Sequence, residues 1–138
     1  MEEQFIAHKH ALALKELGFD EPCFAFYAIP NVENKLFFDI DPDDGELTSL
    51  NQNQIYHNNL SEVGRISAPL KQQAFRWFRE KYGMYSHIKT SGKISVLEFT
   101  WVSNGKYGFF SKNGFETYEE AELECLNKLI EIVETKSE

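Results

Sequence analysis

Cysteine and long apolar runs are both scarce in this chain of 138 residues. Two cysteines, Cys23 and Cys125, are too few for the disulfide framework that stabilises small secreted domains. No apolar run approaches the roughly 20 residues that a membrane-spanning helix needs. The first five residues, Met-Glu-Glu-Gln-Phe, lack the basic end and apolar run of a signal peptide. We therefore expect a cytoplasmic protein with no membrane partner.

Motifs that bind metals or cofactors are also missing. The sequence contains no H-E-x-x-H, no G-x-S-x-G, no phosphate-binding glycine loop and no dinucleotide fingerprint. His8 and His10 would point about 200° apart on a helix and could not share a metal ion. A calcium loop starting at Asp39 would need glycine and glutamate where Asp44 and Leu50 stand. We expect no metal and no cofactor, and the sequence favours a protein that is not an enzyme.

Charge is distributed in three blocks. The chain has 22 acidic and 14 basic residues, a net charge of −8. Residues 1–65 carry 12 acidic and 4 basic residues, residues 66–112 carry 2 and 8, and residues 113–138 carry 8 and 2. The basic middle block is also rich in aromatic residues. Such a pattern indicates either an anion site or neutralisation of charge within the fold.

Three helices are predicted from apolar residues at helical spacing and from their end signals. Gly18 would end the first helix and Gly83 the second, with Ser67 as the N-cap of the second. The third would begin with a capping box, in which the Thr117 hydroxyl caps the helix and Glu120 reaches back to the Thr117 amide. The predicted helices span residues 3–17, about 69–82 and 117–134.

Five strands are expected between these helices. Turn-rich links, above all Asn104-Gly105, favour antiparallel hairpins. Polar residues 41–65 are expected to form a loop, with a short strand at 54–57. The sequence thus predicts one α+β domain, 1–138, with a single antiparallel sheet of about five strands and three helices in the order α-β-β-α-β-β-β-α. The expected strands are 23–29, 35–40, 84–89, 94–102 and 106–110.

The basic aromatic block 71–93 contains the candidate binding residues. Arginine binds phosphate or carboxylate through its planar fork, and an aromatic ring can stack on a base. The aromatic residues Trp77 and Phe78 are expected in the core instead. The candidates are Arg76, Arg79, Lys81, Tyr85, His87 and Lys89.

Three sequence blocks stand out in chain order: ALKELGFDEPCF at 13–24, QAFRWFREKYG at 73–83, and TYEEAELECL at 117–126. Together they cover about a third of the chain. They resemble a family of small hypothetical proteins encoded by phages and prophages of gut-type bacteria. The resemblance implies an accessory protein of a mobile element that acts in the bacterial cytoplasm. It carries no catalytic or binding residues over to this chain.

Two functions remain open. The first is a non-enzymatic accessory protein that binds a host protein. The alternative is a protein that binds or sequesters a nucleotide or short nucleic acid through block 71–93, in an anti-defence role. The net charge of −8 argues against general duplex binding. The sequence leaves open whether the chain acts as a monomer or as a homodimer.

Arg76 and Arg79 could bind an external anion or neutralise acidic residues of the same chain, and replacing both distinguishes the two roles. We favour the internal role, in which the pair neutralises the acidic parts of the same chain. Replacing both with alanine should then lower the free energy of unfolding, more so at low salt, because salt screens such attractions. Denaturant unfolding at two salt concentrations measures this. A double variant within about 0.5 kcal/mol of the parent that loses its ligand would contradict the internal role.

Overall fold

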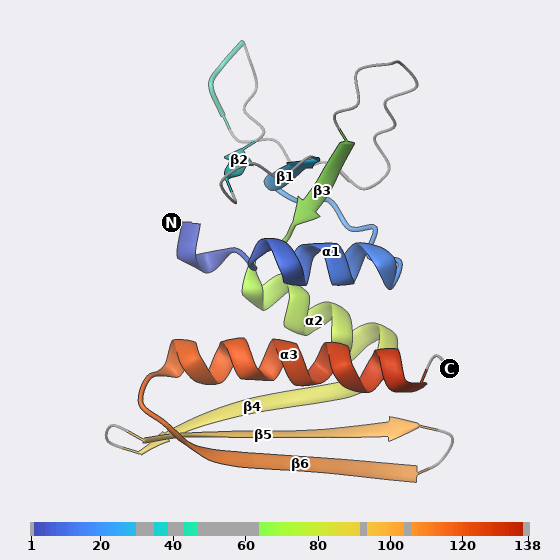
Figure 1. Cartoon of the computed structure of the whole chain (residues 1–138), viewed down its shortest axis with the longest axis vertical. Coiled ribbons are helices and arrows are strands. Elements are labelled where there is room, and N and C mark those ends of the chain that lie inside the picture. Colours follow the sequence, from blue (N-terminus) through green and yellow to red (C-terminus); the bar gives the residue numbers. More distant parts are fainter. Residues whose placement is uncertain are drawn as a thin grey trace. The chain divides into compact units, whose positions relative to one another are not determined.

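The α+β class and the three predicted α-helices are confirmed in the computed structural model (Figure 1). The structure describes residues 2–29, 35–38, 43–46, 64–91, 94–103 and 106–136. Over this part the chain divides into two units, Met1–Lys71 and Gln72–Glu138. That a single domain spans 1–138 stays a prediction, and most of the expected loop 41–65, with its strand at 54–57, lies outside the described residues.

The first unit holds a three-stranded antiparallel sheet and helix α1 (His8–Glu16). Strand β1 (Ala25–Ile29) lies between β2 (Leu36–Phe38) and β3 (Gly64–Ala68). Tyr27 is buried, and its hydroxyl donates a hydrogen bond to the Ile6 carbonyl at 2.8 Å. Its ring also meets the His8 ring of α1 edge-on, with 5.3 Å between centroids. The Tyr27 side of this sheet is therefore the side that packs on α1 and the segment before it.

Helix α1 starts five residues later than predicted. Glu2–Gln4 form a short 3-10 helix, after which Phe5 bridges to Leu70 and the Ile6 amide donates to the Pro69 carbonyl at 3.1 Å. An amide that bonds across to another segment cannot also continue a helix, so the pairing interrupts it. The end is as predicted, because Gly18 takes the left-handed conformation with φ +94°.

The second unit holds a three-stranded meander, β4 (Met84–Ser91), β5 (Ile94–Ser103) and β6 (Lys106–Phe115). Neighbouring strands are antiparallel, and Ser103 pairs with Lys106, so only Asn104 and Gly105 connect β5 to β6. Helix α2 (Lys71–Tyr82) leads into β4 through Gly83, which has φ +66°. Helix α3 (Tyr118–Lys136) lies along one face of the sheet (Figure 1).

The strands form two three-stranded sheets instead of the single sheet of about five that was expected. The difference comes from β3, which lies at the end of the expected loop and was not predicted. It pairs with β1 over five residues and so completes a sheet within the first unit. Ser67 belongs to this strand, where it pairs with Phe26, and is therefore not the N-cap of α2. Pairing with a distant strand has overridden the local capping preference of serine.

The described helices include none that is both long and apolar enough to span a lipid bilayer.

Thr117 caps α3 as predicted, since its Oγ1 accepts a hydrogen bond from the Glu120 amide at 3.1 Å. The return bond differs: the Glu120 carboxylate accepts from the Glu116 amide at 3.2 Å, not from Thr117. Both bonds satisfy amides that have no partner inside the helix. The capping interactions therefore involve Glu116, Thr117 and Glu120.

Thr117→Ala should lower the free energy of unfolding by about 1 kcal/mol, because the Glu120 amide loses its acceptor. Urea unfolding measures this. Thr135→Ala is the matched control, since that exposed hydroxyl only donates to the Glu131 carbonyl within the same helix. An equal loss in both variants would contradict a capping role for Thr117.

Candidate binding surface

Strand β4 places three of the predicted residues in one row. Tyr85, His87 and Lys89 occupy alternate positions and are exposed, Tyr85 by 60%. Met84, which faces the other way, is buried. Alternation along a strand therefore turns this row, here called the β4 row, away from the face that carries α3.

The strand register extends the β4 row across the sheet. Tyr85 pairs with Thr100 on β5, and Thr100 pairs with Phe109 on β6. Two residues further along β4, His87 pairs with Glu98. The backbone register thus relates the β4 row to positions on both other strands of the sheet.

The other three predicted residues lie on α2. Arg76 and Arg79 are exposed and three residues apart, on the side opposite the buried Ala74 and Phe78. Lys81 is also exposed, but its Nζ lies 5.0 Å from the centroid of the Trp77 ring and 5.6 Å from that of Tyr82. These cation–π contacts hold the Lys81 ammonium against its own helix. The six predicted residues thus divide between two elements.

Both cysteines are buried, and Cys125 is not a nucleophile in this environment. Burial is the main cause that raises the pKa of the Cys125 thiol to about 12; nearby Glu122 adds to the shift, and a hydrogen bond with Ser86 opposes it. Cys125 is therefore a neutral thiol at physiological pH, whereas a reactive cysteine needs the thiolate. The Cys23 thiol lies 3.5 Å from the Glu21 carbonyl oxygen.

The acidic segment has the geometry of a turn where it is described. The Glu46 amide donates to Asp44 Oδ1 at 2.8 Å, and Gly45 has φ +75°. This is the turn chemistry that Asp and Gly favour. Asp39 and Asp41 lie outside the described residues. Within the described ranges, no three His, Cys, Asp or Glu side chains gather as metal ligands would.

The sequence analysis missed a cluster of four side chains on the first sheet. Phe26 and Phe37 stack across β1 and β2, Arg65 lies over the Phe26 ring, and Lys35 lies over the Phe37 ring. We call these four residues the cation–aromatic cluster. The alternating aromatics at 24 and 26 were a signal for it, but the strand that supplies Arg65 was not predicted.

The pKa of Cys125 predicts a specific loss of stability at alkaline pH. An unfolded thiol titrates near pH 8.5, whereas the folded one keeps its proton up to about pH 12. Its contribution to stability is thus complete below pH 8.5 and is lost as pH rises toward 12. Between pH 8 and pH 10, wild type should lose about 2 kcal/mol more than Cys125→Ala. Urea unfolding at both pH values measures this; equal losses would contradict the raised pKa.

Comparison with known proteins identifies no relative of this chain. No protein-family model, no curated protein and no solved structure matches the chain. The resemblance to phage-encoded proteins therefore stays a prediction.

Proposed function

We propose that this protein is a non-enzymatic accessory protein of a phage or related mobile element, and that its β4 row binds a host protein. The observation that carries the proposal is the exposure of Tyr85, a large side chain on a sheet face that is 60% exposed to solvent. Tyrosine is enriched in protein interfaces because it combines an apolar ring with a hydroxyl that can find a partner.

The neighbours of Tyr85 indicate the chemistry of the partner. His87 and Lys89 follow it on the same side of β4, and both are exposed. An aromatic anchor beside basic groups suits a partner that offers an apolar pocket with acidic residues at its rim. The resemblance to phage-encoded proteins supports a host protein as that partner.

A nucleotide is the competing ligand, since an aromatic ring beside a lysine also suits base stacking and phosphate binding. The two groups of basic residues lie on different elements, and Lys81 is held against Trp77 and Tyr82. This arrangement favours the protein partner. The ratio of absorbance at 260 and 280 nm of the purified protein is the check: a ratio raised by a co-purified nucleotide that Tyr85→Ala removes would overturn the proposal.

Tyr85→Ala should reduce capture of the host partner at least about tenfold, as loss of an anchoring aromatic residue does. Tyr118→Ala is a matched control, because Tyr118 is also exposed, by 41%, but belongs to α3. Immobilised wild type and both variants would be incubated with bacterial lysate, and the bound proteins quantified by mass spectrometry. The partner should be depleted with Tyr85→Ala alone.

Crosslinking adds a direct measurement of contact. A photoreactive amino acid at position 85 should crosslink to the captured protein, and the same group at position 118 should not. Circular dichroism spectra must agree among all variants. A partner captured equally by Tyr85→Ala, or crosslinked only from position 118, would contradict the β4 row as the binding surface.

A further inference from the structure

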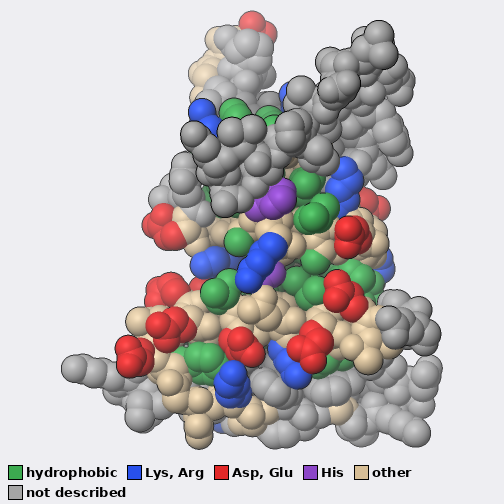
Figure 2. All heavy atoms as spheres, in the orientation of Figure 1, with side chains coloured by type: hydrophobic (Ala, Val, Ile, Leu, Met, Phe, Trp, Pro, Cys, Tyr) green, Lys and Arg blue, Asp and Glu red, His purple; other side chains and the backbone are tan. Residues whose placement is uncertain are grey.

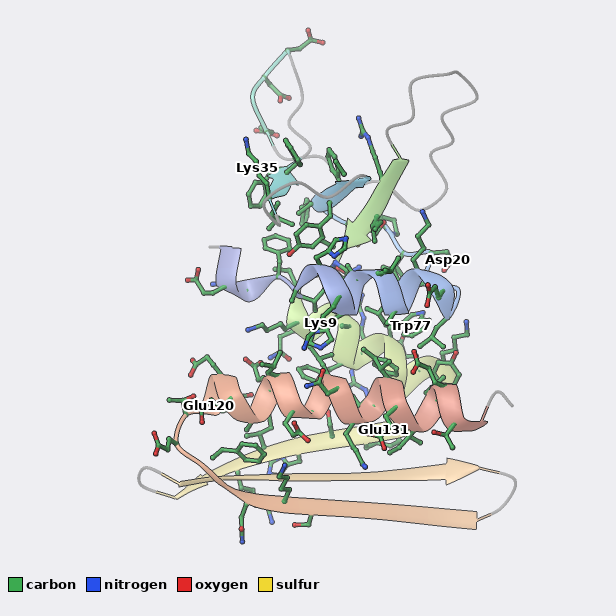
Figure 3. All side chains as sticks on the ribbon, viewed as in Figure 1. Lys9, Asp20, Lys35, Trp77, Glu120 and Glu131 are labelled. Carbon is green, nitrogen blue, oxygen red and sulfur yellow. The ribbon has the colours of Figure 1, made fainter. Side chains whose placement is uncertain are left out.

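The cation–aromatic cluster is assembled from all three strands of the first sheet. Phe26 on β1 pairs with Phe37 on β2, and their rings stack with 5.6 Å between centroids and 17° between planes. Arg65 of β3 places its Cζ 4.4 Å from the centroid of Phe26. Lys35, directly before β2, places its Nζ 5.1 Å from the centroid of Phe37 (Figure 3).

This cluster lies on the sheet face opposite α1. Ala25 and Tyr27, the strand neighbours of Phe26, are buried, and Tyr27 contacts the α1 side. Phe26 and Phe37 therefore face the other way. Phe37 is 37% exposed. The face thus presents an exposed aromatic side chain together with two cations.

The stacking order decides what the cluster can bind. Phe26 stacks on Phe37 and has the Arg65 guanidinium over its ring, and Phe37 has the Lys35 ammonium over its own ring. A nucleobase stacking on either ring would compete with these neighbours. The edge of an aromatic ring carries partial positive charge. The edges and both cations attract the same kind of ligand, an anion.

We propose that the cation–aromatic cluster is a docking surface for an acidic protein segment that also carries large apolar side chains. Carboxylates of the segment would pair with Arg65 and Lys35, and its apolar side chains would cover Phe37. Charge complementarity selects this occupant: the cluster concentrates two cations within a chain whose net charge is −8. A second copy of the chain is also acidic, so the test must distinguish self-association from binding of another acidic protein.

This inference is independent of the partner proposed for the β4 row, because it concerns the other unit of the chain. Tyr85→Ala should therefore leave binding at the cluster unchanged. The two proposals can therefore be contradicted separately. One predicts that Lys35 and Arg65 variants lose peptide binding, and the other predicts that Tyr85→Ala loses capture of the host protein.

The test uses a fluorescein-labelled peptide in which glutamate and phenylalanine alternate, and fluorescence anisotropy on the full chain. A glutamine-for-glutamate peptide reports the need for charge, and labelled oligothymidylate reports nucleic-acid binding. The acidic peptide should bind at least about tenfold more tightly than the glutamine peptide, with affinity falling as salt rises. Equal binding of both peptides, or tighter binding of the oligonucleotide, would overturn the proposal.

Variants locate the site. Lys35→Glu with Arg65→Glu should weaken peptide binding at least about tenfold, whereas Lys9→Glu, an exposed lysine of α1, should change it less than about twofold. Phe37→Ala should weaken binding, with Leu12→Ala as control at nearly the same exposure, 38%. Lys35→Gln with Arg65→Gln provides a milder pair if charge reversal unfolds the chain. Equal effects of the cluster variants and their controls would overturn the site.

Sedimentation velocity addresses the second copy. The chain should sediment as the same species with and without the Lys35→Glu and Arg65→Glu substitutions. A wild-type dimer that these substitutions dissociate would mean that the cluster binds another copy of the chain, and would overturn the acidic-segment proposal.

Discussion

Each unit depends on one side of a three-stranded sheet being buried under a helix. In the first unit, the Tyr27 hydroxyl bonds to the Ile6 carbonyl while its ring packs against His8 of α1. In the second, Met84 of β4 and Cys125 of α3 are buried. Burial of apolar area stabilises such layers by about 25 cal/mol per Å², provided that buried polar atoms keep hydrogen bonds.

The same constraint produces the two candidate surfaces. Successive strand residues point to opposite faces, so residues that alternate with the buried ones must point away from the covering helix. On β4 these are Tyr85, His87 and Lys89. On the first sheet they are Phe26 and Phe37, with Arg65 and Lys35 over their rings. Acidic side chains are frequent along α3 (Figure 2).

Local signals predicted much of the fold. Gly18 and Gly83 end their helices with positive φ, and the Thr117 hydroxyl caps α3. Asn104-Gly105 lies between two strands that pair directly on either side of it. Each of these features needs only a few neighbouring residues, which is why they can be inferred from sequence spacing. Tyr85, His87 and Lys89 were predicted from the composition of block 71–93, whereas their alignment as one row follows from the strand alternation in the structure.

The sequence by itself determined the three helices, the glycines at which the first two end, and most of the order of the elements. The tertiary structure decided which strands share a sheet, because the partner of a strand depends on residues far away in the chain. Residues 64–68 carry no clear strand pattern, yet they pair with β1, convert Ser67 from a cap into a strand residue and bring Arg65 to Phe26. The cation–aromatic cluster exists only because β3, which lies far along the chain from β1 and β2, joins them in one sheet.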